Sequence, residues 1–144
     1  MEGYPHHYLA NAVGGAEGDV VVSGKDLPPL GTQSPPQFGG PDGVWSPETM
    51  LSATVANCFV LSFRAIARAS KFDWTTLECD VDGILDRVDR RPYFTEFHVH
   101  AKLRVPTDQK LELAQRLLEK AEQICLITES LKAEVTLTTD IEVG

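Results

Sequence analysis

The sequence predicts an α+β fold in which strands and two helices build one hydrophobic core. Three observations predict it: a long apolar stretch with helix signals at residues 46–70, a cleanly alternating strand at residues 95–105, and an apolar stripe with helical spacing at residues 106–125. With the flanking segments, the order is a β-rich start, a helix, two strands, a helix and a strand. That order is typical of α+β proteins.

The length of 144 residues fits a single compact domain, and a hydrophobic content of 42% is ordinary for a soluble protein. We expect one domain over residues 1–144. Within it, residues 1–45 form an N-terminal hairpin and a Pro/Gly-rich loop, and residues 46–144 form the core with both helices.

Charge and cysteine content limit the partners and the compartment. The net charge of −8 makes the surface acidic and repels phosphate groups, so neither nucleic acid nor a membrane is an expected partner. The N-terminus lacks the pattern of a secretory signal, and the most apolar stretch, residues 50–67, is shorter than the roughly 20 residues that span a bilayer. Three cysteines without CxxC or zinc-type spacing fit a reducing compartment. We expect a cytoplasmic protein that needs no metal or other cofactor.

The first 45 residues predict one short hairpin and a loop. Residues 8–13 and 19–22 flank a Gly-Gly pair, as in a hairpin. From Gly24 to Trp45 the chain is rich in proline and glycine, which predicts a long structureless loop of functional or mobile character.

The first helix is predicted to begin at Ser46 as N-cap, with Pro47 in the first turn and Glu48 at the positive end of the helix dipole. It is expected to run to about Ser70. Between residues 50 and 63 the helix is apolar on nearly every face, so it must be enclosed on all sides. Because one small sheet cannot enclose it, we expect a homodimer that buries the rest.

The strands that follow carry one cysteine and two histidines. Residues 72–88 predict a strand with Leu77, Cys79 and Val81 on one side of the alternation and Cys79 in a structural role, and residues 89–92 predict a turn. In the next strand, His98 and His100 lie on the polar side, which indicates a solvated face rather than a metal site.

The C-terminal part predicts a helix and a strand. Residues 106–108, ending with Asp108, are expected to start the second helix. Its apolar positions, spaced by three and four, place Cys125 at the end of the buried stripe. Residues 133–143 predict the last strand.

Three stretches of this sequence resemble the family of osmotically inducible protein C and the organic hydroperoxide resistance proteins (OsmC/Ohr). Residues 46–51 leading to residues 56–59 resemble the family's N-P-E-x-L…A-A-C-F helix. Residues 121–128 resemble its A-x-x-x-C-P-I-S segment, and residues 132–137 resemble its closing K-A-E-I-T-L strand. The resemblance covers the chain from about Ser46 to the end.

This resemblance implies intertwined homodimers in which antiparallel sheets wrap two long central helices. It also implies a thiol peroxidase that reduces organic hydroperoxides, with Cys58 peroxidatic, Cys125 resolving and Glu48 as the family's acid. A thiolate would attack the O–O bond and become a sulfenic acid, a second thiol would form a disulfide with it, and an external dithiol would reduce that disulfide.

Helix geometry separates Glu48 from Cys58. Ten helical residues correspond to about 15 Å along the axis and about 280° around it, so the two side chains cannot touch within one helix. If they share a site, two such helices must pair antiparallel across a dimer axis. We therefore predict an intersubunit site.

The family's arginine, which bridges the glutamate and the cysteine, has no counterpart here. The first arginine in the sequence is Arg64, and the family position falls at Ala16 or Gln37. A mid-helix thiol in apolar surroundings needs a positive charge or a helix N-terminus to form a thiolate. We expect Cys58 to gain nothing from a helix end.

Four cations are candidate replacements for the missing arginine, and the proline after the second cysteine is replaced by Leu126. The candidates are Lys25, Arg64, Arg90 and Arg91.

Two functions follow as alternatives. The first is a peroxidase that acts on organic hydroperoxides in oxidative-stress defence. The second is an OsmC-like protein without efficient peroxidase activity, which binds a hydrophobic ligand or senses redox state slowly. Four aromatic side chains fit either an apolar lining for a fatty or aromatic hydroperoxide or packing between subunits: Phe38, Trp45, Phe59 and Phe63.

Overall fold

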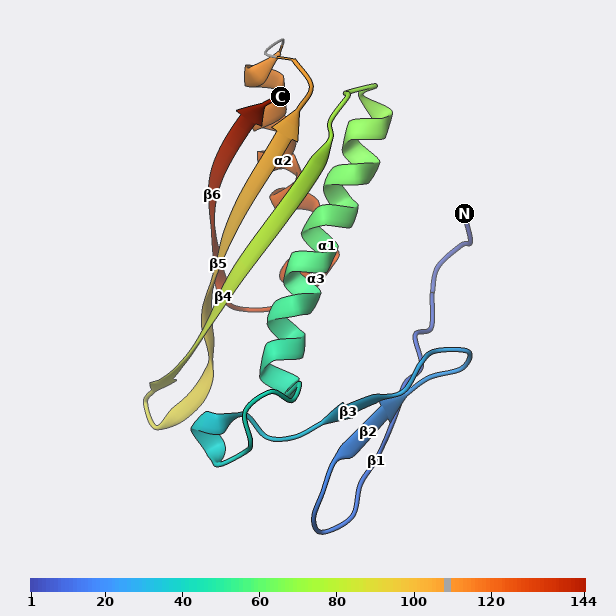
Figure 1. Cartoon of the computed structure of the whole chain (residues 1–144), viewed down its shortest axis with the longest axis vertical. Helices are drawn as coiled ribbons and strands as arrows, with labels where there is room; N and C mark the ends of the chain where they lie inside the picture. Colours follow the sequence, from blue (N-terminus) through green and yellow to red (C-terminus); the bar gives the residue numbers. More distant parts are fainter. Residues whose placement is uncertain (108–109) are drawn as a thin grey trace. The chain divides into compact units, whose positions relative to one another are not determined.

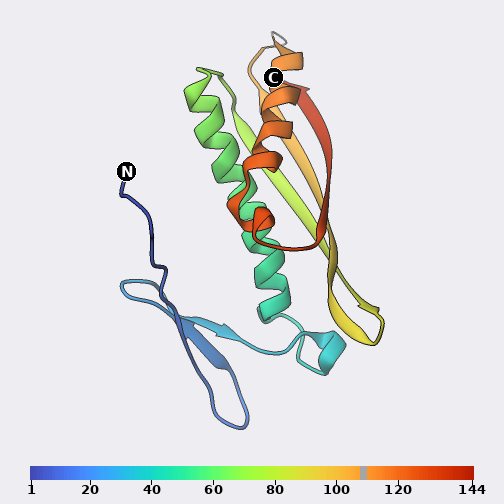
Figure 2. The same cartoon turned by 180° about the vertical axis from the view of Figure 1, so that it is seen from behind.

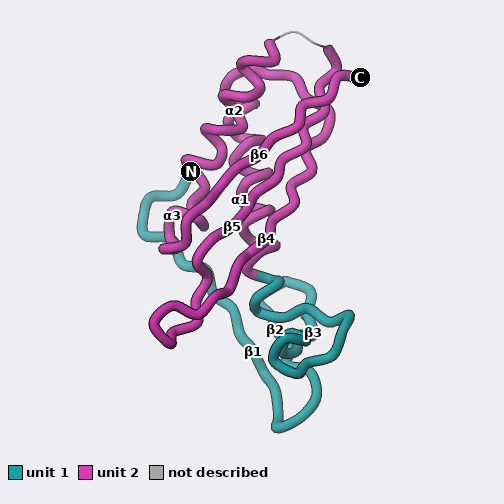
Figure 3. Tube along the Cα trace, turned by 90° about the vertical axis from the view of Figure 1, so that its left-hand side faces the viewer, with its two compact units in different colours: residues 1–50 teal, residues 51–144 magenta. Residues whose placement is uncertain are grey.

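The structure, a computed structural model, describes residues 1–107 and 110–144. It divides into two compact units, Met1–Met50 and Leu51–Gly144, coloured separately in Figure 3. Asp108, expected to help start the second helix, lies outside the described residues.

The first unit contains a small antiparallel sheet. Its strands β1 (Asn11–Val13), β2 (Val20–Ser23) and β3 (Leu30–Thr32) lie in the order β1-β2-β3, followed by a short 3-10 helix, η1 (Pro36–Phe38). The predicted hairpin is confirmed as β1 and β2.

The prediction of a structureless loop from Gly24 to Trp45 is wrong in part, because β3 and η1 lie within it. The glycines and prolines concentrate in the turns around β3. Leu30–Thr32 can therefore pair with β2 on the side that β1 does not occupy. Thr32 adds a side-chain bond, donating from Oγ1 to the Val20 carbonyl at 2.8 Å.

The predicted first helix is confirmed as α1 (Pro47–Ala69). Ser46 caps it: its Oγ accepts from the Thr49 N–H at 3.1 Å, and Thr49 Oγ1 accepts from the Ser46 N–H at 3.0 Å. At the other end, Lys71 adopts a left-handed conformation (φ 52°), and the Phe72 N–H donates to the Ala67 carbonyl at 2.9 Å. This closure satisfies the last carbonyls of the helix.

The main sheet of the second unit has the order β4-β5-β6 (Figure 1). Strands β4 (Thr76–Val88) and β5 (Arg91–Val105) form an antiparallel hairpin. Its tip is Asp89 and Arg90, both with positive φ, as a tight two-residue turn requires. The turn is therefore shorter than the one predicted over residues 89–92.

Strand β6 (Glu134–Val143) runs parallel to β5, so the expectation of purely antiparallel sheets is wrong for this pair. The reason is the helical crossover between them. Two parallel neighbouring strands need a connection that returns the chain to the end of the sheet at which the first strand began. The helical segment after β5 supplies this connection.

The helical segment begins later than predicted and is broken at Cys125. Helix α2 spans Leu111–Ile124 after Lys110, whose φ is 61°, and α3 spans Leu126–Glu129. Cys125 itself has φ −61° and ψ 111°, an extended conformation that turns the chain between the two helices. Figure 2 shows α2 and α3 beside α1.

The core lies between the sheet and the helices. Along β5 the buried residues alternate strictly, so only one face of the strand is covered, and both α1 and α2 must cover that face. The buried residues are Val55, Phe59, Phe63, Ile66 and Ala67 from α1, Phe97, Val99, Ala101, Leu103 and Val105 from β5, and Ala114, Leu117, Leu118 and Ala121 from α2.

Helix α1 is not enclosed on all sides within one chain. Leu61 is 50% exposed, and Ala53 and Asn57 are exposed on the same helix. By length and composition α1 could also cross a membrane, a test that core helices of globular proteins pass as well.

Candidate functional site

The structure brings Cys58 and Cys125 together. Cys58 lies in the middle of α1, and Cys125 lies at the break between α2 and α3. Their thiols are in hydrogen-bond contact, and neither is in a disulfide. Cys58 is half-buried, whereas Cys125 is only 1% exposed. Cys58 is therefore the more accessible residue of the pair.

Several hydrogen-bond donors act on the Cys58 thiol. Burial alone would raise the pKa of this thiol, but hydrogen bonds from the Ile127 N–H, the Cys125 thiol, the Ser62 hydroxyl and the Leu126 N–H outweigh it. The pKa is therefore lowered from its usual 9.0. The Ser62 Oγ lies 3.9 Å from the sulfur, one helical turn further along α1.

The expectation that Cys58 gains nothing from a helix end is wrong. Leu126 and Ile127 are the first two residues of α3, and the amides of a first helical turn have no partner inside their own helix. Hydrogen bonds from the main chain of these two residues are among the causes that lower the pKa of Cys58. The donors come from a different helix, so the position of Cys58 within α1 does not matter.

Cys125 has the opposite environment. Burial raises its pKa, donors from the Thr128 N–H and hydroxyl lower it, and a negative charge on Cys58 raises it further. Thr128 is itself buried, and the Cys125 carbonyl, 3.2 Å from its Oγ1, is an alternative acceptor for its one hydroxyl proton. Cys58 is therefore the thiol that ionises first.

Cys79 projects from β4 toward the core, opposite Ala101 of β5, as predicted. Burial, followed by the charges of Asp80 and Cys125, raises its pKa to about 12. It is a core thiol in electrostatic range of Cys125, and at neutral pH it stays protonated.

Glu48 lies in the first turn of α1, ten residues before Cys58. Its Oε1 is buried without a hydrogen-bond partner. The groups that lower the pKa of Cys58 are hydrogen-bond donors rather than any of the four candidate cations. All four of those cations are exposed.

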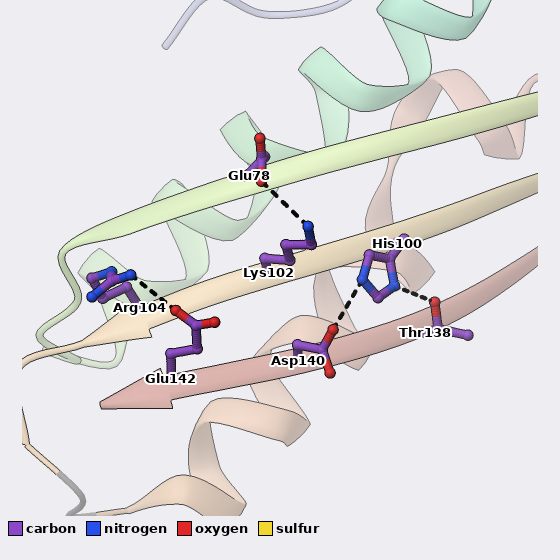
Figure 4. A network of polar contacts seen from close by, with 7 residues as sticks. All are labelled: Glu78, His100, Lys102, Arg104, Thr138, Asp140 and Glu142. Carbon is purple, nitrogen blue, oxygen red and sulfur yellow. Dashed lines mark hydrogen bonds and ion pairs between the residues drawn. The ribbon is translucent and has the colours of Figure 1, made fainter. Parts of the chain in front are cut away.

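The two histidines lie on the polar face of the sheet, as predicted. Figure 4 shows His100. His100 contacts Asp140 at 3.1 Å and Thr138 at 2.6 Å, and His98 lies 3.6 Å from Glu96. Among the described residues, no group of three or more histidine, cysteine or acidic side chains is arranged to hold a metal ion.

Two of the four aromatic side chains are core residues rather than pocket lining. Phe59 and Phe63 are 1% and 0% exposed, and the Phe63 ring packs edge-to-face on Trp74 with centroids 5.3 Å apart. The other two, Phe38 and Trp45, are 62% and 48% exposed in the first unit.

Sequence reasoning missed three groups at this site: the Ser62 hydroxyl, the pair of α3 amides and Thr128. The spacing of four between Cys58 and Ser62 on a predicted helix could have identified the first. The amides give no sequence signal, because every residue except proline carries one.

Known proteins provide matches for most of this chain. The family described as OsmC-like protein matches residues 40–140. The organic hydroperoxide resistance protein of Xanthomonas axonopodis pv. citri (strain 306) is 30% identical over 130 residues, covering 90% of this chain and 89% of the relative. Peroxiredoxin OsmC of Escherichia coli (strain K12) is 28% identical over 101 residues, covering 70% and 69%.

Solved structures agree on the fold. An OsmC-like protein from Vibrio cholerae O1 superposes with a TM-score of 0.84 at 15% identity, covering 95% of this chain and 99% of that one. An organic hydroperoxide resistance protein OsmC from Legionella pneumophila gives a TM-score of 0.75 at 23% identity, covering 98% and 100%. The family match over residues 40–140, together with this fold, means that the chain belongs to the OsmC-like protein family.

Proposed function

We propose that this protein is a cysteine-based thiol peroxidase that reduces organic hydroperoxides, with Cys58 as the peroxidatic and Cys125 as the resolving cysteine. The observation that carries the proposal is the contact between two thiols of unlike pKa, lowered at Cys58 and raised at Cys125. The names of the relatives from Xanthomonas and Escherichia coli support the substrate class.

In the first step the Cys58 thiolate attacks the outer oxygen of the hydroperoxide. The O–O bond breaks, the sulfur is oxidised to a sulfenic acid, and the departing alkoxide takes up a proton and leaves as the alcohol. A thiolate is needed because the neutral thiol is a poor nucleophile. The donors around Cys58 favour that charge.

In the second step Cys125 attacks the sulfenic sulfur. The S–S bond forms, and hydroxide leaves and is released as water with the proton of the Cys125 thiol. Because the two sulfurs are already in contact, this step needs little movement of α3. An external dithiol then reduces the disulfide by thiol exchange, as expected for a cytoplasmic enzyme.

We also propose that the active form is a homodimer in which Glu48 of one chain approaches Cys58 of the other. Two observations support this: the exposed apolar side of α1, and the Glu48 Oε1 that is buried without a partner. A folded monomer with full activity, measured by light scattering and turnover on the same sample, would contradict it.

The test of the peroxidase is a titration of the reduced protein with tert-butyl hydroperoxide, followed by intact mass and thiol counting. We expect rapid loss of two thiols per chain with one equivalent of oxidant. Cys58→Ser abolishes the rapid loss, and Cys125→Ser stops at a sulfenic acid that dimedone captures. Cys79→Ala is the matched control and retains the wild-type course. Slow oxidation that does not depend on Cys58 would refute the proposal.

A second candidate is an OsmC-like protein that binds a hydrophobic ligand or senses redox state slowly. The absence of any arginine before Arg64 favours it. The same titration separates the two functions, because a binder or slow sensor consumes hydroperoxide far below one equivalent within minutes.

A further inference from the structure

We infer that the second unit carries a small-molecule site, separate from the thiols, that takes an organic carboxylate with an apolar body. A cavity of about 210 Å³ lies where α1 ends, β5 ends and α2 begins, at one end of the unit (Figure 1). Eleven residues separate Cys58 from Ala69, the last residue of α1, or about 16 Å along the helix axis. The inference therefore does not rest on the proposed function.

Apolar side chains of the core line part of this cavity. Val105 is 2% exposed, and Phe72 and Leu113 are partly buried side chains that pack against the core. Sites for drug-sized ligands measure roughly 300–1,000 Å³, so a cavity of about 210 Å³ fits a smaller molecule. The apolar lining favours a ligand with a hydrocarbon body, because burying that body removes apolar surface from water.

Two lysines, Lys71 and Lys110, line the same cavity. Among residues 1–107 and 110–144, neither ammonium group takes part in an ion pair. Asp73 also lines the cavity, so the charged lining residues that the structure describes, two positive and one negative, have a net charge of +1. This sign is opposite to the net charge of −8 of the whole chain. A net charge of +1 favours a monoanion over a dianion.

The backbone holds both lysines in a conformation that favours glycine. The φ angles are 52° at Lys71 and 61° at Lys110. Hydrogen bonds fix both residues: the Lys71 N–H donates to the Arg68 carbonyl at 3.1 Å, and the Ala114 N–H donates to the Lys110 carbonyl at 3.0 Å. Residues held in such conformations cluster at ligand sites. The two lysine side chains thus start from fixed points on separate elements, which reduces the entropy lost on binding.

Together the lining favours one carboxylate on an apolar body. The ammonium groups pair with the carboxylate oxygens, and the hydroxyls of Ser70 and Thr107, which also line the cavity, can donate to the same oxygens. The hydrocarbon body covers the apolar side chains. Inorganic phosphate fits less well, because it leaves those side chains uncovered and, as a dianion, is repelled more strongly by Asp73.

The test is a titration of the full chain with benzoate, followed by amide NMR. We expect saturable shifts at the amides of Phe72 and Leu113. Benzamide has the same ring without the charge, and inorganic phosphate has the charge without the ring. Each should bind at least about fivefold more weakly than benzoate. Absence of a saturable benzoate shift would overturn the site, and equal affinity for phosphate would overturn the carboxylate assignment.

Two variants test the lysines. Lys71→Gln and Lys110→Gln change exposed side chains, and each should weaken benzoate binding about two- to fivefold. Lys25→Gln removes the same charge from an exposed position in the first unit and is the matched control, with wild-type affinity expected. Thermal melting checks that all three variants fold. Equal weakening in all three would mean that benzoate responds only to the net charge of the chain, which would overturn the inference.

Discussion

Cys58 and Cys79 are the same residue type, both half-buried in one unit, yet their pKa values move in opposite directions. Burial is the largest single influence on each, and it raises both. The groups next to each thiol account for the opposite directions of the two pKa shifts. Hydrogen bonds from amide and hydroxyl donors lower the pKa of Cys58, whereas the charges of Asp80 and Cys125 raise the pKa of Cys79 further. In this protein, neighbouring donors and charges rather than exposure decide in which direction each thiol pKa moves.

The largest expected effect is a contrast in alkylation rate at pH 7. A thiol with a pKa of about 12 is ionised in on the order of one molecule in 10⁵, so Cys58 should react at least about 10³ times faster than Cys79. Isotope-coded iodoacetamide with peptide mapping measures both sites in one sample. Comparable rates would show that burial, not the donors, governs these thiols.

The second effect concerns stability at alkaline pH. Because the pKa of Cys79 is about 12 in the folded state and 9.0 when unperturbed, the folded state retains a proton that the unfolded chain loses above pH 9. Its contribution to stability is thus fully present below pH 9 and is lost as the pH rises toward 12. The slope is up to about 1.4 kcal/mol per pH unit.

Urea unfolding of the wild type and Cys79→Ala at pH 8, 9, 10 and 10.5 measures this slope. We expect the variant to lose less of its unfolding free energy over the same range. Parallel curves would mean that Cys79 titrates normally in the folded protein.

How far the sequence predicts this site depends on the kind of group involved. The first helix, the β4–β5 hairpin and the alternation along β5 follow from periodicity and turn residues, and the structure has them close to the predicted bounds. The side chains of Cys58 and Cys125 were predicted from the resemblance. The parallel pairing of β6 was not, because local patterns do not determine strand direction after a helical crossover.

The main-chain donors were beyond prediction for a physical reason. The orientation of the Leu126 and Ile127 amides depends on the break at Cys125, and a continuous apolar stripe gives no sign of that break. The same holds for the start of α2, where Lys110 in a left-handed conformation delays the helix to Leu111. Backbone conformation at single residues determined what the site contains.

A smaller effect should follow from removing Cys125. Its thiol is one of the donors that lower the pKa of Cys58, so Cys125→Ala should raise the pH midpoint of Cys58 alkylation by iodoacetamide and slow alkylation at pH 7 by about three- to tenfold. Cys125→Ser, which retains a donor, is the matched control and should shift less. An unchanged midpoint in Cys125→Ala would assign the lowering wholly to the amides and Ser62.

The smallest expected effect concerns Cys79, the second thiol of the comparison. Asp80 is exposed beside Cys79, and its charge raises the pKa of that thiol. Asp80→Asn should lower the alkaline midpoint of Cys79 alkylation by a few tenths of a unit, because an exposed charge is screened by water and salt. The Cys58 midpoint should stay unchanged, and 0.5 M NaCl should reduce the difference between wild type and variant. An equal shift of the Cys58 midpoint would mean that the charge of Asp80 acts on both thiols alike. The donor-rich environment of Cys58 and the acidic environment of Cys79 would then not be separate.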